Sequence, residues 1–170
     1  MPKRTQRGWI AWLAGGVLSA VAAGAPAATR DAFLDRLAGH WLMKGTVGHT
    51  AVSYDADGRW MLADGWLRLS LIDAAKPPAY EADVYLGFDP KAGDCVVHWL
   101  DRYGAAGARV VGVGHRREQT LVFEFPYAES TFRDTLTLAE DGAAGALLIE
   151  SIEPAGHVST FASYTLTRRP

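Results

Sequence analysis

The sequence predicts an all-β protein, an antiparallel up-and-down β-barrel of about eight to ten strands with a short N-terminal helix. Short runs rich in Val, Tyr, Phe and Trp recur through residues 40–168, as is typical of strands. Asp-Gly pairs at 64–65 and 141–142 mark tight turns between such runs. Only Ala32–Ala38 has a convincing helical pattern. A β-sandwich is the alternative, but closing the sheet into a barrel removes the exposed edges that so many strands would otherwise leave.

The first 27 residues have the pattern of a secretory signal peptide. Three basic residues and no acid precede an almost wholly apolar stretch, Trp9–Ala23, and an Ala-x-Ala site follows. The apolar stretch is shorter than the roughly 20 residues of a membrane helix. We therefore expect cleavage after Ala27, which leaves residues 28–170 as one exported domain, periplasmic or secreted, without a membrane span. An uncleaved N-terminal anchor is the alternative.

Charge and cysteine content exclude several classes of protein. Residues 28–170 contain 14 Lys and Arg against 19 Asp and Glu, a net charge of −5 with neutral histidines. A mildly acidic domain without clustered basic residues does not suit nucleic acid. Cys95 is the only cysteine, so an intramolecular disulfide is impossible, and we expect this side chain to be a small buried hydrophobe.

The expected elements follow in chain order. Thr29 or Asp31 can cap the helix Ala32–Ala38, and Gly39 ends it. A further tight turn is expected at residues 55–58, and longer loops at 73–79 and 104–108. Some neighbouring runs can form one bent strand, which gives the total of eight to ten. The expected strands are 40–47, 49–55, 58–64, 66–72, 80–88, 95–103, 108–117, 119–127, 130–139, 145–153 and 157–168.

A Gly-x-Trp sequence, Gly39-His40-Trp41, opens the first expected strand directly after the helix. It resembles the start of the first strand in the calycin superfamily, the lipocalins and their relatives. In that group the Trp packs at the closed end of the barrel, often under a basic residue from the last strand. The resemblance implies that Arg168 has this role here.

Further motifs extend the resemblance over residues 39–169. A Gly-aromatic-Asp sequence at 87–89, Trp-x-Asp at 99–101 and a closing Tyr-Thr-x-x-Arg at 164–168 resemble a bacterial lipocalin-like family of uncharacterised function. A haem-binding, nitrobindin-like branch of the superfamily opens with Gly-x-Trp-x-Gly-x-Gly. Residues 42–45 here, Leu-Met-Lys-Gly, do not keep that pattern.

Aromatic residues on the expected strands suggest a ligand pocket inside the barrel. Residues two apart on a strand share a face, so Leu121, Phe123 and Phe125 should line the interior together. In 66–72 and 95–103 both faces are half apolar, and periodicity does not distinguish them. An aromatic lining with a few polar groups is typical of a small-molecule site. The candidate walls are Trp66, Tyr85, Trp99, Phe123 and Phe125, and the candidate orienting groups are Arg68, His98 and Asp101.

Catalytic and metal-binding patterns are weak. The odd spacing of His98 and Asp101 puts them on opposite faces of a regular strand, so they do not form a dyad without a bulge. None of the five histidines forms a close pair, and no metal site is expected. Gly112 and Gly114 lack the third glycine of a dinucleotide-binding loop, and indicate a strand that another part of the chain approaches closely.

Carboxylates are numerous but not evidently paired. Glu124, Asp134 and Glu150 fall on separate expected strands. If two of them met inside the barrel, one would have a raised pKa and could act as an acid or base. An ordinary cross-strand ion pair of Arg133 with Glu124 or Glu150 is the simpler expectation.

The sequence therefore favours an exported barrel that binds a small apolar or amphipathic molecule, with no cofactor expected. One alternative is a cyclase-like or isomerase-like enzyme acting through Arg68, His98 or Asp101. A haem or nitric-oxide binder is a second, with His98, His115 or His157 as the iron ligand. A partner-binding barrel with an exposed apolar patch is a third. No motif indicates the ligand or the oligomeric state.

Overall fold

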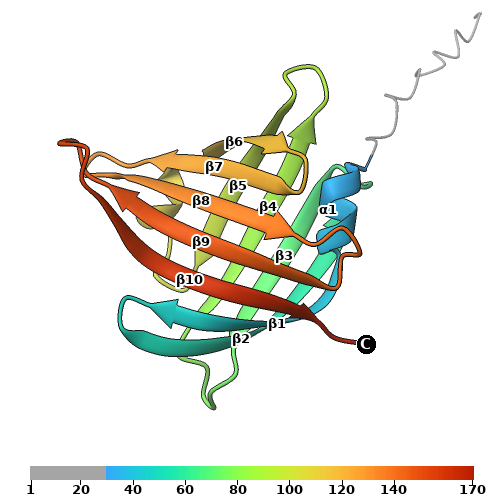
Figure 1. Ribbon diagram of the computed structural model, residues 1–170, viewed down its shortest axis with the longest axis horizontal. Coiled ribbons are helices and arrows are strands. Elements are labelled where there is room, and N and C mark those ends of the chain that lie inside the picture. Colours follow the sequence, from blue (N-terminus) through green and yellow to red (C-terminus); the bar gives the residue numbers. More distant parts are fainter. Residues whose placement is uncertain (1–29) are drawn as a thin grey trace, which may run out of the picture.

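The computed structural model describes residues 30–170, which form one short α-helix, one turn of 3₁₀ helix and ten strands (Figure 1). The predicted signal peptide, residues 1–27, lies outside the described residues. The elements are α1 (Ala32–Leu37), β1 (Gly39–Val47), β2 (Thr50–Met61), β3 (Trp66–Asp73), β4 (Glu81–Asp89), β5 (Asp94–Asp101), η1 (Gly107–Arg109), β6 (Gly112–Arg117), β7 (Thr120–Pro126), β8 (Thr131–Leu138), β9 (Ala144–Ile152) and β10 (Val158–Arg168).

All ten strands form one closed barrel in which each strand pairs antiparallel with its neighbours in the chain. The last strand, β10, pairs with β1, and this pairing closes the sheet. The register there runs from Trp41 opposite Arg168 to Val47 opposite Ala162. The predicted all-β, up-and-down barrel with a short N-terminal helix is therefore confirmed. Within residues 30–170, no helix is long and apolar enough to cross a lipid bilayer.

The turn predicted at residues 55–58 was wrong, because β2 runs through it without a break. Ala56 and Gly58 point into the barrel and are buried. A Cβ atom on Gly58 would lie 2.4 Å from the carbonyl oxygen of Leu37, the last residue of α1. The small residues therefore allow the helix to lie close to the strand. The same small residues in the sequence had predicted a turn.

The helix α1 lies at one end of the barrel (Figure 1). Asp31 is its N-cap, and its carboxylate accepts hydrogen bonds from the backbone N–H groups of Phe33 and Leu34. Phe33, Leu34 and Leu37 are buried. This short helix is amphipathic, so its apolar side closes this end of the barrel and its cap fixes where it begins.

Arg168 and Trp41 meet at the closed end, as the calycin resemblance implies. The Arg168 guanidinium carbon lies 4.3 Å from the centroid of the Trp41 ring. The same guanidinium donates hydrogen bonds to the carbonyl oxygens of Gly142, Ala38 and Arg36. Since the carbonyls belong to α1, the β8–β9 turn and the residue before β1, Arg168 links the last strand to three other parts of this end.

We expect Arg168→Ala to lower the free energy of unfolding by about 2–3 kcal/mol, because three partly buried carbonyls lose their donor and Trp41 loses its cation–π contact. Urea denaturation followed by tryptophan fluorescence measures this change. Arg168→Lys is the informative comparison, because a lysine keeps the charge but lacks the planar fork of donors. It should recover less than half of the loss. Full recovery by lysine would show that charge alone is sufficient.

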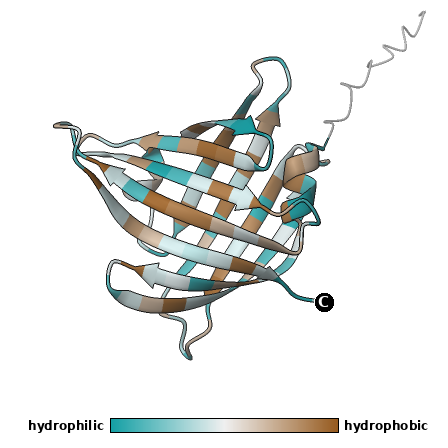
Figure 2. Ribbon diagram, in the orientation of Figure 1, coloured by the Kyte–Doolittle hydropathy of each residue, from teal (hydrophilic) through white to brown (hydrophobic). Residues whose placement is uncertain are grey.

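Hydrophobic and hydrophilic residues alternate along many stretches of the strands (Figure 2). Buried and less buried positions alternate in the same way, for example along β3 and β7, so the apolar residues form the inner face. Cys95 belongs to the inner face, where burial raises the pKa of its thiol to about 11. A thiol of that kind is unreactive at neutral pH, in agreement with the expected structural role. Other fully buried inner-face residues are Trp41, Met43, Leu67, Leu86, Val97, Leu121, Leu138 and Leu166.

Candidate functional site

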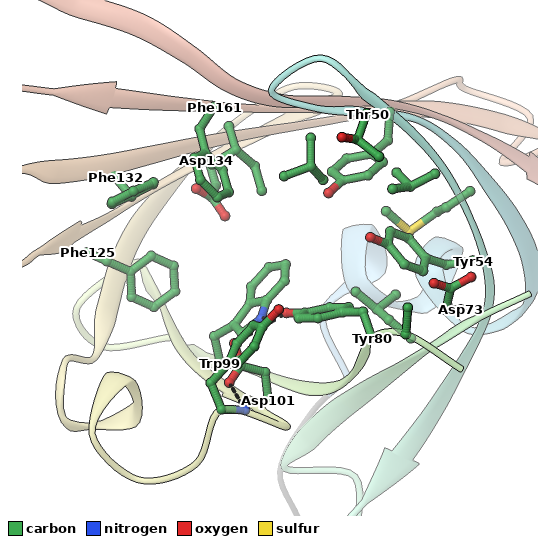
Figure 3. Close-up of a pocket in the computed structure, with 18 of the residues that line it drawn as sticks. Thr50, Tyr54, Asp73, Tyr80, Trp99, Asp101, Phe125, Phe132, Asp134 and Phe161 are labelled. Carbon is green, nitrogen blue, oxygen red and sulfur yellow. Dashed lines mark hydrogen bonds between the residues drawn. The ribbon is translucent and has the colours of Figure 1, made fainter. Parts of the chain in front are cut away.

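The barrel contains a cavity of about 530 Å³ that lies toward the end opposite α1 (Figure 3). Residues of the connections at that end, including Ala79 and Tyr103, belong to its lining. The lining combines many aromatic rings with a few polar groups, the usual composition of a small-molecule site. The lining residues are Met43, Val47, Thr50, Val52, Tyr54, Leu71, Asp73, Ala79, Tyr80, Trp99, Asp101, Tyr103, Phe125, Tyr127, Phe132, Asp134, Ile149, Phe161 and Tyr164.

Tyrosines form one wall of the cavity. The Tyr54 ring lies 5.7 Å from Tyr80 and 5.9 Å from Tyr164, measured between centroids. The indole N–H of Trp99 donates to the Tyr80 hydroxyl at 2.9 Å, and that hydroxyl donates to Asp101 at 3.4 Å. Burial raises the pKa of Tyr80 and of Tyr164 well above the ordinary value. These phenols therefore stay protonated at neutral pH.

Phenylalanines and one further tyrosine form the second wall. Phe125 stacks on Tyr127 with centroids 6.3 Å apart, and Tyr127 meets Phe132 edge-on at 5.8 Å. Phe132 in turn contacts Phe161 edge-on at 5.1 Å. Phe161 sits where the pairing of β10 with β9 shifts register, between Thr160 and Ala162. The bulge explains why Phe161 joins the lining although its neighbour Ala162 already points inward.

Two glycines on β6 make room for the phenylalanines. A Cβ on Gly112 would lie 2.8 Å from the Phe125 ring, and one on Gly114 would lie 2.5 Å from the Cβ of Phe123. The sequence interpretation of this Gly-Val-Gly segment as a closely approached strand is therefore confirmed. Because these two inward positions of β6 carry no side chain, Phe123 and Phe125 can occupy this part of the interior.

Asp134 is the most unusual residue of the lining. It is only 2 % exposed, and its Oδ1 atom is buried without a hydrogen-bond partner. None of the ion pairs formed within residues 30–170 includes it. Burial raises its pKa from 3.8 to about 7, because a carboxylate is poorly solvated there. Figure 3 shows its carboxyl group at the cavity.

The charge of the lining is one-sided. Three carboxyl groups, those of Asp73, Asp101 and Asp134, belong to it. No lysine, arginine or histidine of the described chain is among the residues that surround the cavity. Asp73 and Asp101 each accept a hydrogen bond from a nearby backbone N–H, at 2.9 Å in both cases. Asp134 has no such partner, so its carboxyl remains available to a bound molecule.

Solved structures of other proteins share this architecture, among them the two that follow. The S-type phycobiliprotein lyase CPES from Guillardia theta is similar over 81 % of this chain and 91 % of its own, with 15 % identity and a TM-score of 0.57. The protein Rv2717c from M. tuberculosis is similar over 84 % of this chain and 100 % of its own, with 12 % identity and a TM-score of 0.58. The fold is that of a lipocalin-like barrel. No family model matches the sequence, and no curated protein is similar to it.

Four of the eight predicted site residues point into the lipocalin-like barrel. Trp99, Asp101 and Phe125 line the cavity, and Phe123 is buried inside the barrel beside Phe125. They lie on β5 and β7, and Asp101 is the last residue of β5. The inner face of β5, which the sequence left open, is therefore the one that carries Cys95, Trp99 and Asp101. Whether these residues bind a ligand stays a prediction.

The other four predicted residues lie on the outer wall of the lipocalin-like barrel, so their placement inside was wrong. Trp66 and His98 contact each other there, with ring centroids 5.6 Å apart. Arg68 reaches to within 3.7 Å of Asp83. The leucines of β3 take the inner face, and Tyr85 pairs with Arg68 and His98 in the outer register.

The outer position of Trp66 also has a local cause. A Cβ on Gly87 would lie 3.0 Å from the Trp66 ring, so the indole lies against a strand position without a side chain. Because the glycine of the Gly-aromatic-Asp motif has no side chain, the indole can pack directly against the backbone of β4 on the outside of the barrel. An aromatic ring in a strand can be well packed on either face, and its hydrophobicity alone does not decide which.

Sequence reasoning did not place Tyr54, Tyr80, Tyr164 or Asp134 at the site. For Asp134 a signal was present, because it shares the inner face of β8 with Phe132, Leu136 and Leu138. A lone acid within an apolar face is unusual unless it has a partner or a function. The sequence alone suggests a role for Asp134 only as one member of a carboxylate pair. Its pKa is raised by burial and not by a second acid.

The cavity residues do not fit a haem held by histidine. All five histidines lie within residues 30–170, and none belongs to the lining. His98 is on the outer wall against Trp66, and His115 pairs with Asp94 at 2.8 Å on an exposed part of β6. His157, in the β9–β10 connection, is exposed. Among the described residues, no group of three His, Cys, Asp or Glu is placed to hold a metal ion.

Proposed function

We propose that this protein is exported and binds a small apolar or amphipathic molecule inside its lipocalin-like barrel. The observation that carries the proposal is the 530 Å³ cavity, lined by two aromatic walls with a few polar groups between them. One end of the barrel is closed by α1, so the connections at the opposite end offer the entry route. The shared fold with an S-type phycobiliprotein lyase supports a small-molecule role at the level of the fold.

Export is the part of the proposal that rests on residues 1–27. A protein expressed with its full N-terminus and purified from the periplasm or medium without detergent should have the mass of residues 28–170 in native mass spectrometry. A tightly held ligand would add a discrete mass, and an absorption spectrum would identify a coloured one. A mass that retains residues 1–27 would contradict cleavage after Ala27 and favour the anchored alternative.

Filling part of the cavity should weaken binding without unfolding the barrel. Val52 lines the cavity, and Val52→Trp should weaken binding of the neutral dye N-phenyl-1-naphthylamine by about tenfold or more. Dye fluorescence titration measures the change. Val113→Trp is the matched control, because Val113 is 48 % exposed on the outer face of β6. The same titration should give an unchanged affinity for that variant.

A broader ligand screen can contradict the binding proposal. If delipidated protein shows no change in melting temperature with any lipid, aromatic or tetrapyrrole probe, the cavity has no ligand role. Equal loss of dye affinity in both tryptophan variants would likewise locate the dye outside the barrel.

A catalytic role is the second candidate, and the structure changes which residue favours it. The enzyme alternative relied on Arg68, His98 or Asp101, and two of these lie on the outer wall. Asp134 instead has the pKa, about 7, of a carboxyl that can accept or release a proton at neutral pH. Turnover of a bound compound by the native protein but not by Asp134→Asn would establish this role.

A further inference from the structure

We propose that the ligand of this barrel is an organic cation, an apolar or aromatic amine or quaternary ammonium compound whose positive charge is held by Asp134. This inference rests on the proposed binding function and specifies its ligand class. It comes from the unmatched carboxyl group in the cavity together with the aromatic rings around it.

The charged groups of the cavity lining favour a ligand with a positive charge. The lining supplies three carboxyl groups and no basic side chain from the described chain. A fatty acid or other anionic amphiphile would bring its negative charge to a lining that offers carboxyl groups and no positive partner, which is costly in a poorly solvated site. A cation, in contrast, would provide Asp134 with the charge partner that the protein does not supply.

The aromatic rings favour the same class of ligand. Tyr127, Phe132 and Phe161 form an edge-to-face series on the wall that includes β8, the strand of Asp134. Tyr80 and Trp99 belong to the facing wall (Figure 3). The faces of such rings carry negative electrostatic potential and attract ammonium groups, whose weak hydration in quaternary form eases their transfer into the cavity. Carboxylate and rings together therefore suit a cation with an apolar body.

The groups that face Asp134 do not compete for its charge. Its inner-face neighbours on the adjoining strands are Phe123 of β7 and Ile149 of β9, both apolar. Tyr127 and Tyr164 are the titratable groups whose pKa Asp134 itself raises, after the larger effect of burial. They stay neutral at pH 7. Asp73 and Asp101, elsewhere in the lining, are acids and add to the preference for a cation.

Three probes test the inference. Each contains a naphthalene ring, and they differ in charge, which is positive, neutral or negative. They are (1-naphthylmethyl)trimethylammonium, 1-naphthalenemethanol and 1-naphthalenemethanesulfonate, and binding is measured by calorimetric titration. At pH 8.5 the cation should bind at least about tenfold more tightly than the alcohol, and the sulfonate should not bind measurably. Since the ammonium and sulfonate charges are permanent, any pH dependence belongs to the protein.

The pH profile provides a second readout. With the Asp134 pKa at about 7, the cation should bind roughly 30-fold more tightly at pH 8.5 than at pH 5.5, because the carboxyl must ionise to pair with it. Asp134→Asn should remove both the pH dependence and the preference over the alcohol. Glu150→Gln is the matched control, because it removes one negative charge from the outer face of the neighbouring strand β9. It should bind as the native protein does.

The outcomes distinguish failure of the proposed binding function from failure of the cation inference. If no probe binds, both the binding function and the cation inference fail. If the alcohol or the sulfonate binds as tightly as the cation at pH 8.5, the cavity binds ligands but the cation inference is overturned. Tighter binding of the alcohol below pH 7 would show that protonated Asp134 donates a hydrogen bond to a neutral ligand. The native protein alone yields these results, so they do not depend on how the variants fold.

Discussion

Asp134→Asn is expected to stabilise the unliganded protein by about 4 kcal/mol at pH 8 and to leave its stability nearly unchanged at pH 4. The carboxyl has a pKa of about 7 in the folded barrel and about 3.9 in an unfolded chain, so folding requires the carboxylate to leave water. The folded state holds the proton more tightly. Its contribution to stability is therefore complete below pH 4, declines as the pH rises toward 7, and is lost above 7.

The measurement is the free energy of unfolding of both proteins in urea at several pH values between 4 and 8. The difference between the two curves isolates Asp134, because every other titrating group is common to both. A constant difference across this range would contradict the raised pKa. Glu150→Gln again provides the control, since it changes the net charge by the same amount without removing a buried group.

Gly45→Ala is expected to lower the free energy of unfolding by about 3–5 kcal/mol, a loss large enough to prevent folding of many single-domain proteins. Gly45 of β1 lies opposite Tyr164 of β10, where the first and last strands meet. A Cβ atom at this position would lie 1.8 Å from the carbonyl oxygen of Ser163, which is backbone and has no rotamer through which to move away. One methyl group would therefore force β1 and β10 apart.

Circular dichroism and urea denaturation measure the loss. Gly107→Ala is the matched control, because an added Cβ there has no atom within 4 Å, and its effect should stay within about 0.5 kcal/mol. If Gly45→Ala unfolds at the same urea concentration as the native protein, the close approach of the two strands is not as the structure has it.

The architecture was predictable because its signals are local and repeated. Turn sequences, alternating apolar residues and one amphipathic helix each limit a short segment, and together they leave few alternatives to a barrel. Asp31 as the helix cap and the Arg133–Glu124 ion pair, at 2.8 Å, are of this local kind. The turn misplaced at residues 55–58 shows where this reasoning ends. A segment of small residues can form a turn, or it can lie in a strand that another part of the chain approaches closely. Here it is the second case, because α1 packs against Gly58, and the local sequence does not show that contact.

The candidate site was only half predictable, for a related physical reason. Both faces of β3 and β5 carry aromatic or aliphatic residues, so period-two alternation cannot tell the inside from the outside. The decision depends on other strands, since Gly87 of β4 gives Trp66 a place on the outer wall and leaves Leu67 to the interior. The tyrosine wall likewise collects Tyr54, Tyr80 and Tyr164 from distant parts of the chain.

The pairing of β1 with β10 has a consequence for the order in which the chain folds. Trp41 and Arg168 stand opposite each other in that pair, so the seam of the barrel joins the beginning of the domain to its last few residues. Neighbouring hairpins can form as soon as they are synthesised, but the seam waits until β10 has left the ribosome. Contacts of such large sequence separation slow folding. In an incomplete chain, the edge of β1 that pairs with β10 would stay unpaired. A premature stop before Val158 would therefore yield an aggregation-prone open sheet instead of a shorter barrel.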